Sequence, residues 1–526
     1  MLKINNVKVS LNEKRYTKVI SQILNVREKE IKNVQLIRQS VDARRSKVHF
    51  ICSFAFETDD EEQFMKQHSK HQLSYYKPYV YKYLPKNNHK VMVVGSGPAG
   101  LFCAYVLAKA GQDVIVVERG KAVEDRVKDV DELLEKGILN PESNITFGEG
   151  GAGTFSDGKL TTGIKNERIP YVLETFVAHG APKDILYLSK PHIGTDYLRN
   201  VVKSMREEII SLGGKVYFET QFMNFTKEND KYKVNVLQQG EEKEYIVDDL
   251  VLAIGHSARD TYESLYKNEM IQMIPKAFAV GVRIEQSQKV IDEIQYHRYA
   301  SHPALKAANY KLAVQTKEKR GVYTFCMCPG GYVVPSSSEE GYLCINGMSE
   351  YKRDGDNANS AILVTVNPDD FESQHPLSGI EFQRKIEKKA FELGGSNYCA
   401  PASLVNDYLE NKVSDDFKGI VSTYRPGIKF VDMNELFPSF INRALKEGLV
   451  LMNKRMPGFI NDDTLIIGVE GRSSSPVRIL RNNQYRIDNE RIYPIGEGAG
   501  YAGGIISSAI DGIMAAEQIL RSDENC

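Results

Sequence analysis

A glycine-rich turn between a short apolar run and a helix is the feature that most constrains this chain. Val91 to Val94 is apolar throughout, which is typical of a strand buried on both faces. The turn Gly95-Ser96-Gly97-Pro98-Ala99-Gly100 follows directly. Its first glycine permits the tight turn, the second lets the backbone approach a pyrophosphate, and the third lets helix and strand pack closely. The helix predicted over 99–110 directs free N–H groups and a partial positive charge at such a group.

An acidic residue completes this nucleotide-binding pattern. Gly111 ends the helix, a second buried strand is predicted over 114–117, and Glu118 follows eighteen residues beyond Gly100. A carboxylate at this place accepts hydrogen bonds from an adenosine ribose and disfavours a 2′-phosphate. We therefore predict a Rossmann-type site that does not select NADP, and we assign Glu118 and the adjacent Arg119 to it.

A second glycine-rich turn lies near the other end of the chain. Ile492 to Gly500 is predicted as a strand that enters a turn containing an acid, and a helix is predicted over 505–520. This resembles the second FAD signature of the glutathione-reductase-like flavoproteins, where the acid holds the ribityl chain and the helix start faces the flavin pyrimidine. Glutamate stands here in place of the usual aspartate. The cofactor contacts that the resemblance implies are Gly496, Glu497, Gly504 and Ile505.

A third segment also resembles this clan. Leu252 to Gly255 is similar to its Ala-Thr-Gly turn, which adds Ala253 and Gly255 to the expected FAD site. Strands are predicted over 214–222, ending at Phe222, and over 249–255, and both are expected to join the same domain. The three signatures stand in the order of the clan and imply FAD rather than NAD.

Three further motifs narrow the resemblance. The segments 148–160, 325–331 and 469–476 are similar to a family of largely uncharacterised bacterial FAD-dependent dehydrogenases, which also carries a small N-terminal domain. The resemblance covers essentially the whole chain. The glycine-rich loop 148–160 is expected against the FAD pyrophosphate and isoalloxazine, and the alternative is a structural loop without a ligand. Its expected contacts are Gly150, Gly151, Thr154, Phe155, Ser156 and Lys159.

The length of 526 residues favours two or three domains. We predict an α/β protein with a small N-terminal α+β domain over 1–88 and a Rossmann-type FAD-binding domain over 89–262 and 481–526. Residues 263–480 form an inserted, mostly β (α+β) substrate domain. Between the two FAD turns the chain contains no further Gly-x-Gly-x-x-Gly with a strand before it and a helix after it, so any NAD(P)H is expected to bind only transiently.

Several side chains are weak candidates for catalysis. Cys326 and Cys328 flank a single residue and are either a redox pair or buried thiols that line a pocket. Arg472 either clamps a substrate anion or pairs with Glu470. His192 and His256 are candidates for proton exchange near neutral pH, although a lone histidine is more often structural. No metal is expected, because a zinc site with Cys344 lacks a suitably spaced fourth ligand.

Charge and cysteine content limit the function. The net charge is −1, but the first 90 residues contain 18 lysines and arginines against 9 acidic residues. Seven cysteines suit a reducing compartment, and residues 1–10 alternate polar and apolar without the apolar core of a signal peptide, so we expect a cytoplasmic protein without membrane contact. The leading hypothesis is an FAD-dependent oxidoreductase acting on a small molecule. The alternatives are a flavoprotein whose basic N-terminal domain docks RNA, although nucleic acid is the less favoured partner, and a sensor with structural FAD. The oligomeric state is left open.

Overall fold

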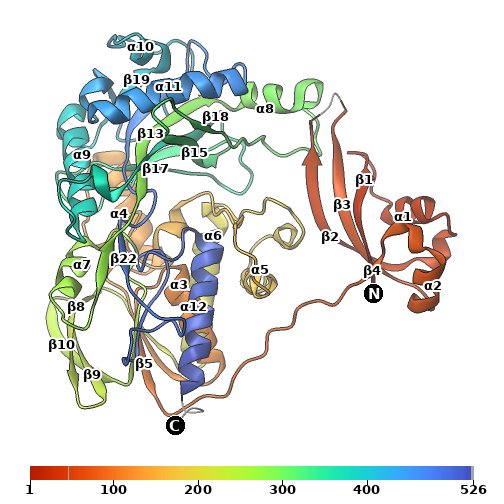
Figure 1. The fold of residues 1–526 in the computed structure, drawn as a ribbon, viewed down its shortest axis with the longest axis horizontal. Coiled ribbons are helices and arrows are strands. Elements are labelled where there is room, and N and C mark those ends of the chain that lie inside the picture. The colour runs from red at the N-terminus through yellow and green to blue at the C-terminus, as the bar shows by residue number, and fades with distance from the viewer. Residues whose placement is uncertain (45–46, 523–526) are drawn as a thin grey trace.

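The computed structural model describes residues 1–44 and 47–522. Its N-terminal part is an antiparallel sheet in the order β2-β3-β1-β4, with two helices on one face (Figure 1). The core between sheet and helices contains Leu2, Ile20, Phe54 and Phe64. The N-terminal part therefore contains both helices and strands around a core of its own. The elements are β1 Leu2–Val9, α1 Tyr16–Leu24, β2 Lys32–Asp42, β3 His49–Glu57, α2 Glu61–Gln67 and β4 Ser74–Tyr75.

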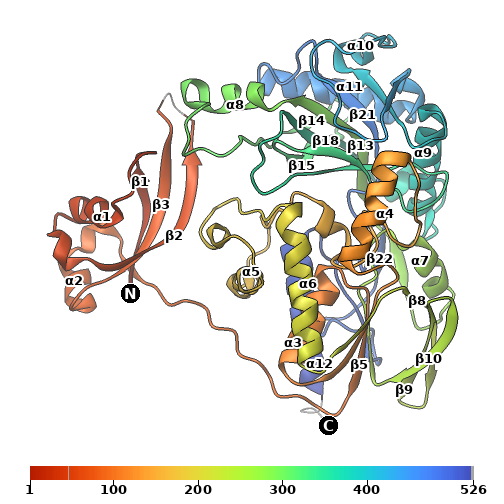
Figure 2. The ribbon, with the colours of Figure 1, turned by 180° about the vertical axis from the view of Figure 1, so that it is seen from behind.

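An extended segment, residues 76–89, leads from this sheet to the rest of the chain (Figure 2). Two of its tyrosines pack on the FAD-binding part. The ring of Tyr81 stacks on that of Tyr171 with centroids 4.1 Å apart, and the hydroxyl of Tyr83 lies 2.9 Å from that of Tyr171. Tyr81 also donates a hydrogen bond to Glu517. These tyrosines hold the segment in place and are not free to stack on a ligand.

A five-stranded parallel sheet in the order β23-β11-β5-β6-β7 forms the centre of the FAD-binding part. The two faces of β5 supply different cores, as expected for a strand buried on both sides. Val91 and Val93 pack against helices α3, α6 and α12, whereas Met92 and Val94 pack against a three-stranded meander. The strands are β5 Lys90–Val94, β6 Asp113–Val117, β7 Lys215–Tyr217, β11 Asp249–Leu252 and β23 Ile492–Pro494.

The two helices predicted in this part, over 99–110 and 505–520, agree with α3 and α12 within one residue. The two long ones that begin at the glycine turns, α3 and α12, lie side by side on one face of the sheet (Figure 1). The bounds are α3 Pro98–Lys109, α4 Val123–Lys136, α5 Ile169–Ala178, α6 Thr195–Ser211, α7 Arg259–Tyr266 and α12 Ile505–Leu520.

The single strand predicted over 214–222 is wrong. The chain turns at Phe218 and Glu219, so β7 ends at Tyr217 in the parallel sheet and β8 begins at Thr220 in the meander. Phe222 is consequently a buried residue of the core between meander and sheet, and its side chain is not available to a cofactor. The meander consists of β8 Thr220–Glu228, β9 Lys231–Gln238 and β10 Glu241–Val247.

A seven-stranded sheet in the order β14-β15-β18-β13-β21-β19-β20 forms the inserted part. Its strands are β13 Phe278–Ser287, β14 Ala313–Gln315, β15 Gly321–Cys328, β18 Asn357–Val366, β19 Ala400–Leu404, β20 Ile428–Phe430 and β21 Leu465–Glu470. The hairpin strands are β16 Tyr332–Pro335 and β17 Ile345–Met348. The helices are α8 Gln288–Tyr296, α9 Ser378–Gly394, α10 Val405–Leu409 and α11 Ser439–Arg455.

Successive side chains of β13 point alternately to the two faces of this sheet. Val280, Val282 and Ile284 belong to the core with α11, on the side away from the parallel sheet (Figure 1). Gly281 and Arg283 point to the opposite face, because side chains alternate along a strand. That second face is turned toward the FAD-binding part and is called here the inner face.

Two groups of contacts bear on where the inserted part begins and ends. The predicted boundary at 262/263 cuts through α7, which packs in the core of the parallel sheet and meander. Two short strands, β12 Met273–Pro275 and β22 Val477–Ile479, pair antiparallel and also belong to that core. We therefore propose that the inserted domain proper begins with β13 and ends with β21.

Candidate flavin site

Two glycines of the first turn are required by the backbone around them. Gly95 has a φ of 97°, and a Cβ there would lie 2.4 Å from the carbonyl oxygen of Ala253. A Cβ at Gly100 would lie 1.9 Å from the oxygen of Gly95. The turn after β11 is therefore packed against the turn after β5, and Pro98 follows as the first residue of α3.

The second signature lies beside the first, although about four hundred residues separate them in sequence. Strand β23 pairs in parallel with β11, which pairs in parallel with β5. A Cβ at Gly496 would lie 2.7 Å from the Cβ of Ala99. The carboxylate of Glu497 lies 3.4 Å from Nδ1 of His256, so this histidine contacts the acid that the resemblance assigns to the ribityl chain.

Open space adjoins four glycines of these turns. A Cβ at Gly255, Gly503 or Gly504 would meet no atom within 4 Å, and one at Gly97 would meet only the Cα of Gly151, at 3.9 Å. The helix α12 begins with Ile505 next to this space, and α3 begins next to Gly97. Two helix N-termini facing space that side chains leave free are suited to the phosphates and the carbonyl groups of a flavin nucleotide. The residues therefore fit FAD.

Glu118 differs from its expected role. One carboxylate oxygen accepts hydrogen bonds from the amide and hydroxyl of Ser96, at 2.9 and 2.8 Å. The other accepts from the amides of Gly120 and Gly148, both at 3.0 Å. Glu118 therefore joins the first turn to the glycine-rich loop, and its acceptor positions are filled by the protein itself.

Arg119 is also held by the protein. Its guanidinium binds Asp260 through two hydrogen bonds of 2.8 Å, binds Glu142, and lies 4.3 Å from the centre of the Phe147 ring. Beside it lies a groove of about 540 Å³ that is also lined by Gly120 and Gln221. The backbone and stacked side chain of Arg119 can border a cofactor, but its charge is already paired.

Arg126 organises the glycine-rich loop from behind. This residue of α4 is fully buried and donates to four carbonyl oxygens, those of Asn144, Ile145, Glu149 and Gly151, over 2.6–3.0 Å. A Cβ at Gly148, whose φ is 114°, would lie 2.5 Å from the Arg126 side chain. Packing against this arginine therefore explains why position 148 of the glycine-rich loop is a glycine.

The polar side chains of the loop are used within the protein. The hydroxyls of Thr154 and Ser156 donate to the backbone oxygens of Glu149 and Gly153, and the amide of Gly150 donates to Ser96. Phe155 is buried, with the guanidinium of Arg126 4.8 Å from its ring centre. Gly153 and Ile505 line one small pocket with Pro98, so the loop does reach the start of α12.

The end of the loop enters a cluster of charges beneath the inserted sheet. Asp157 is buried and binds Arg353 through two hydrogen bonds of 2.8 and 2.6 Å and Lys159 at 2.9 Å. Burial favours the neutral acid, but the charges of Lys159 and Arg353 outweigh it and hold the pKa of Asp157 below its ordinary value. The carboxylate is therefore the anion that fixes two cations at the domain contact.

His192 lies next to this cluster but does not suit proton exchange near neutral pH. Its Nε2 lies 2.9 Å from the oxygen of Tyr351. Burial, and then the positive charge of Arg353, lower its pKa to about 4. The ring therefore stays neutral at physiological pH, which corrects its candidate role.

Cys326 and Cys328 lie at the end of β15, on the same side as Lys159. The Lys159 ammonium is 3.9 Å from Sγ of Cys328, and a guanidinium nitrogen of Arg283 donates to the oxygen of Cys326. Both cysteines are free thiols, with Cys328 buried and Cys326 partly exposed. The structure thus brings Lys159, from the glycine-rich loop, to the cysteine motif, a contact that sequence did not predict.

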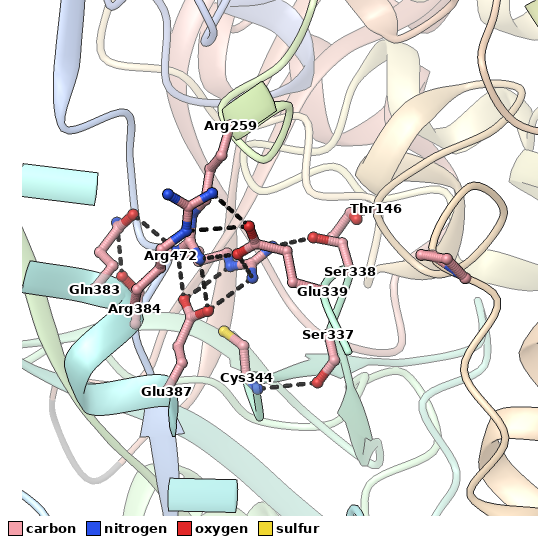
Figure 3. Close-up of polar contacts among 12 residues, drawn as sticks. Thr146, Arg259, Ser337, Ser338, Glu339, Cys344, Gln383, Arg384, Glu387 and Arg472 are labelled. Atoms are coloured by element: carbon pink, nitrogen blue, oxygen red, sulfur yellow. Dashed lines mark hydrogen bonds and ion pairs between the residues drawn. The ribbon is translucent and has the colours of Figure 1, made fainter. Parts of the chain in front are cut away.

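Arg472 is an interdomain ion-pair residue with a different partner from the one expected. It binds Glu387 of α9 through two hydrogen bonds of 2.9 and 2.7 Å, and Arg259 of α7 binds the other side of the same carboxylate (Figure 3). Glu470 instead pairs with Arg283 on the inner face. Because both oxygens of Glu387 are shared by two arginines, neither guanidinium is free to clamp a substrate.

Sequence analysis did not predict the burial or the partners of five charged residues of the site: Arg126, Asp157, Arg283, Arg353 and Glu387. The helical pattern of α4 showed acidic and basic residues without indicating that one arginine points inward. Lys276, whose charge is felt by Glu497, was also missed. Burial, and then the charge of Arg478, lower the pKa of Lys276. In the sequence, only the small residues around Arg472 and the Ser-Asp-Gly-Lys segment at 156–159 indicated a functional site.

Three protein-family models match this chain, and each covers a different part of it. Residues 277–473 match the family described as FAD-dependent protein, C-terminal domain-like, and residues 89–268 match pyridine nucleotide-disulphide oxidoreductase. Residues 1–57 match a domain of unknown function, DUF8436. An uncharacterized protein of Clostridium beijerinckii is 44% identical over 530 residues, covering 99% of this chain and 98% of the relative. The chain belongs to this family of FAD-dependent proteins. The protein is an FAD-dependent oxidoreductase with a Rossmann-type α/β fold.

Solved flavoprotein structures have lower sequence identity to this protein than the Clostridium relative has. A triple mutant of the flavin-dependent brominase Bmp2 has 13% identity and a TM-score of 0.39, with 84% of this chain and 81% of that one covered. The flavin-dependent halogenase CmlS has 13% identity and a TM-score of 0.37, with 83% and 60% covered. Within residues 1–44 and 47–522, no helix combines the length and apolar character that crossing a membrane requires.

Gly97→Ala tests the open space at the first turn. The new methyl group would touch only Gly151, but alanine is a poorer N-cap than glycine, so we expect the stability of the FAD-free protein to fall by no more than about 1 kcal/mol. The methyl group would occupy the approach to the pyrophosphate, and we expect the Kd for FAD to rise at least tenfold, about 1.4 kcal/mol. Fluorescence titration with FAD measures this, with Gly163→Ala, another glycine with open space, as the control. An unchanged Kd would contradict the placement of the cofactor.

Glu387→Gln tests the interdomain ion pair. Removing the charge leaves the partly exposed Glu339 as the remaining acidic partner of Arg259 and Arg472, and we expect the unfolding free energy to fall by about 3 kcal/mol near neutral pH. Burial opposes ionisation, but the two arginines outweigh it and lower the pKa of Glu387 from 4.5 to about 2. Its contribution is therefore complete above the unfolded pKa of 4.5 and is lost as the pH falls toward 2.

The measurement is urea unfolding of wild type and variant across this pH range. The difference in free energy should shrink as the pH falls. The matched control is Glu381→Gln on the same helix, where the carboxylate is mostly exposed and should contribute less than about 1 kcal/mol. A difference that is equal for the two variants, or constant with pH, would show that Glu387 is not the charge that holds these arginines.

Proposed function

We propose that the protein passes hydride between bound FAD and a small molecule that lies between the parallel sheet and the inner face of the inserted sheet. The flavin ring, when bound, supplies the hydride chemistry, and the protein supplies binding and electrostatics. The observation that carries the proposal is the open space at Gly97, Gly255 and Gly504, where the turns after three neighbouring parallel strands and the starts of α3 and α12 meet.

The residues that would hold FAD follow from this arrangement. The start of α3 at Gly97 and Pro98 would bind the pyrophosphate, and Gly496 and Glu497 would border the ribityl chain. The start of α12 at Ile505 would face the pyrimidine. The groove beside Arg119 is a suitable place for the adenine. Nδ1 of His256, 3.4 Å from the Glu497 carboxylate, would border the same part of the site.

The inner face supports a flat and partly apolar substrate. Ala279, Ala361 and Leu363 form a small buried cluster, and Tyr323 and Phe325 pack on it while remaining half-buried. Aromatic side chains that are not fully covered suit stacking with a planar ring. The charged groups of this face, Arg283 and Glu470, neutralise one another and would not demand a charged ligand.

Two finer points belong to the same proposal. The chain is a member of the glutathione-reductase-like clan, and its electrons come from NAD(P)H that binds transiently or from the substrate itself. The free thiols among the described residues suit a reducing compartment such as the cytoplasm.

The test is anaerobic reduction of the FAD-loaded protein. NADH, NADPH and a broad panel of organic donors are mixed with it, and the visible absorbance of the flavin is followed. We expect at least one donor to bleach the flavin faster than it bleaches free FAD at the same concentration, which is the control. Bleaching by none of them would contradict an oxidoreductase that uses small-molecule donors.

A further inference from the structure

We propose that Cys326 and Cys328 are a redox-active dithiol that exchanges two electrons with the flavin, an inference that rests on the proposed FAD-dependent function. The pair would form a disulfide across one residue, Met327, at the inner end of β15. The protein would thus contain a second two-electron centre between the glycine-rich loop and the inserted sheet.

The backbone of β15 brings the two cysteines closer than a regular strand would. Phe325 pairs with Ala361 and Cys328 pairs with Asn359, so three residue steps on β15 span the same length as two on β18. Two steps along a regular strand cover about 6.6–6.8 Å, the upper end of the Cα separation that a disulfide tolerates. The extra residue shortens this span, which favours closure between the first and last residue of the motif.

The extra residue forms a β-bulge in β15, and within this bulge Cys326 has an unusual backbone conformation. Its φ is 42°, in the left-handed region that residues other than glycine rarely adopt. Such strain persists only where the surroundings hold it, and it concentrates at functional sites. Here it accompanies a difference in exposure, since Cys326 is partly exposed and Cys328 is 1% exposed. One thiol is therefore accessible for reaction and the second is positioned to resolve the bond.

Two fixed cations lie next to the pair. Lys159 is 3.9 Å from Sγ of Cys328 and is held by Asp157, and Arg283 donates to the oxygen of Cys326. Burial raises the pKa of Cys326 to about 12, while Lys159 and Arg283 act in the opposite direction. The resting pair is therefore protonated, and the cations stabilise the thiolate that exchange requires.

The reaction balances with oxidised flavin as the acceptor. The two S–H bonds break and one S–S bond forms. The two electrons and one proton pass to the flavin, and the second proton passes to solvent. The reverse reaction restores both thiols and oxidised flavin, so no further reactant is required.

Electron uptake distinguishes this centre from the flavin alone. The FAD-loaded protein is oxidised and then titrated anaerobically by photoreduction. A flavin and a disulfide each take two electrons, so we expect wild type to take up four electrons per FAD and Cys326→Ser and Cys328→Ser to take up two. The control is Cys399→Ser, a partly exposed cysteine outside the motif, which should match wild type. Uptake of two electrons by wild type would overturn the proposal.

Thiol chemistry gives a second readout that needs neither activity nor a variant. After oxidation, peptide mass analysis of wild type should show the loss of two hydrogen atoms between Cys326 and Cys328, reversed by flavin photoreduction. Two alkylated thiols at these positions in the oxidised protein would overturn the proposal. If the protein fails to bind FAD, the proposed function fails by itself. Oxidised glutathione then replaces the flavin as oxidant, and the same peptide shows whether the dithiol closes.

Discussion

The buried guanidinium of Arg126 is the interaction on which the arrangement of the site depends. Its four carbonyl partners lie on both sides of the turn at Gly148, so a single side chain fixes the course of the glycine-rich loop. Burial lowers its pKa to about 10, which still leaves it charged at neutral pH. The loop that it fixes bonds to Glu118 at one end and supplies Asp157 and Lys159 at the other. The FAD turn and the inserted sheet are therefore connected through backbone that this cation holds in place.

Local sequence patterns predicted the parts of the fold that local forces determine. The apolar run 91–94, the glycines at 95 and 100, and the helix 505–520 were predicted because strand burial, backbone crowding and helical periodicity are visible in short windows. The strand over 214–222 was wrong, since its apolar and polar residues do not reveal that the chain changes sheets at Glu219.

The candidate site was predictable only in its backbone. Glycines that leave open space were identified by their motifs, whereas the partners of charged residues depend on segments far apart in sequence. Glu118 and Arg119 occupy the expected positions but are bonded to Ser96, Gly148 and Asp260. Arg472 pairs with Glu387, eighty-five residues away, and nothing in a one-dimensional pattern distinguishes that acid from its exposed neighbours on α9. Long-range electrostatic pairing is the physical reason why these roles required the structure.

The pairing of β12 with β22 has an evolutionary consequence. The chain leaves the nucleotide-binding fold and returns to it through adjacent antiparallel strands, so the two junctions are neighbours in space. An insertion whose two ends are neighbours does not interrupt the parallel sheet. For the nucleotide-binding fold it is equivalent to a long loop whose ends are held together. The substrate-facing half of such a protein can be exchanged during evolution as one cassette, while the cofactor half retains its topology.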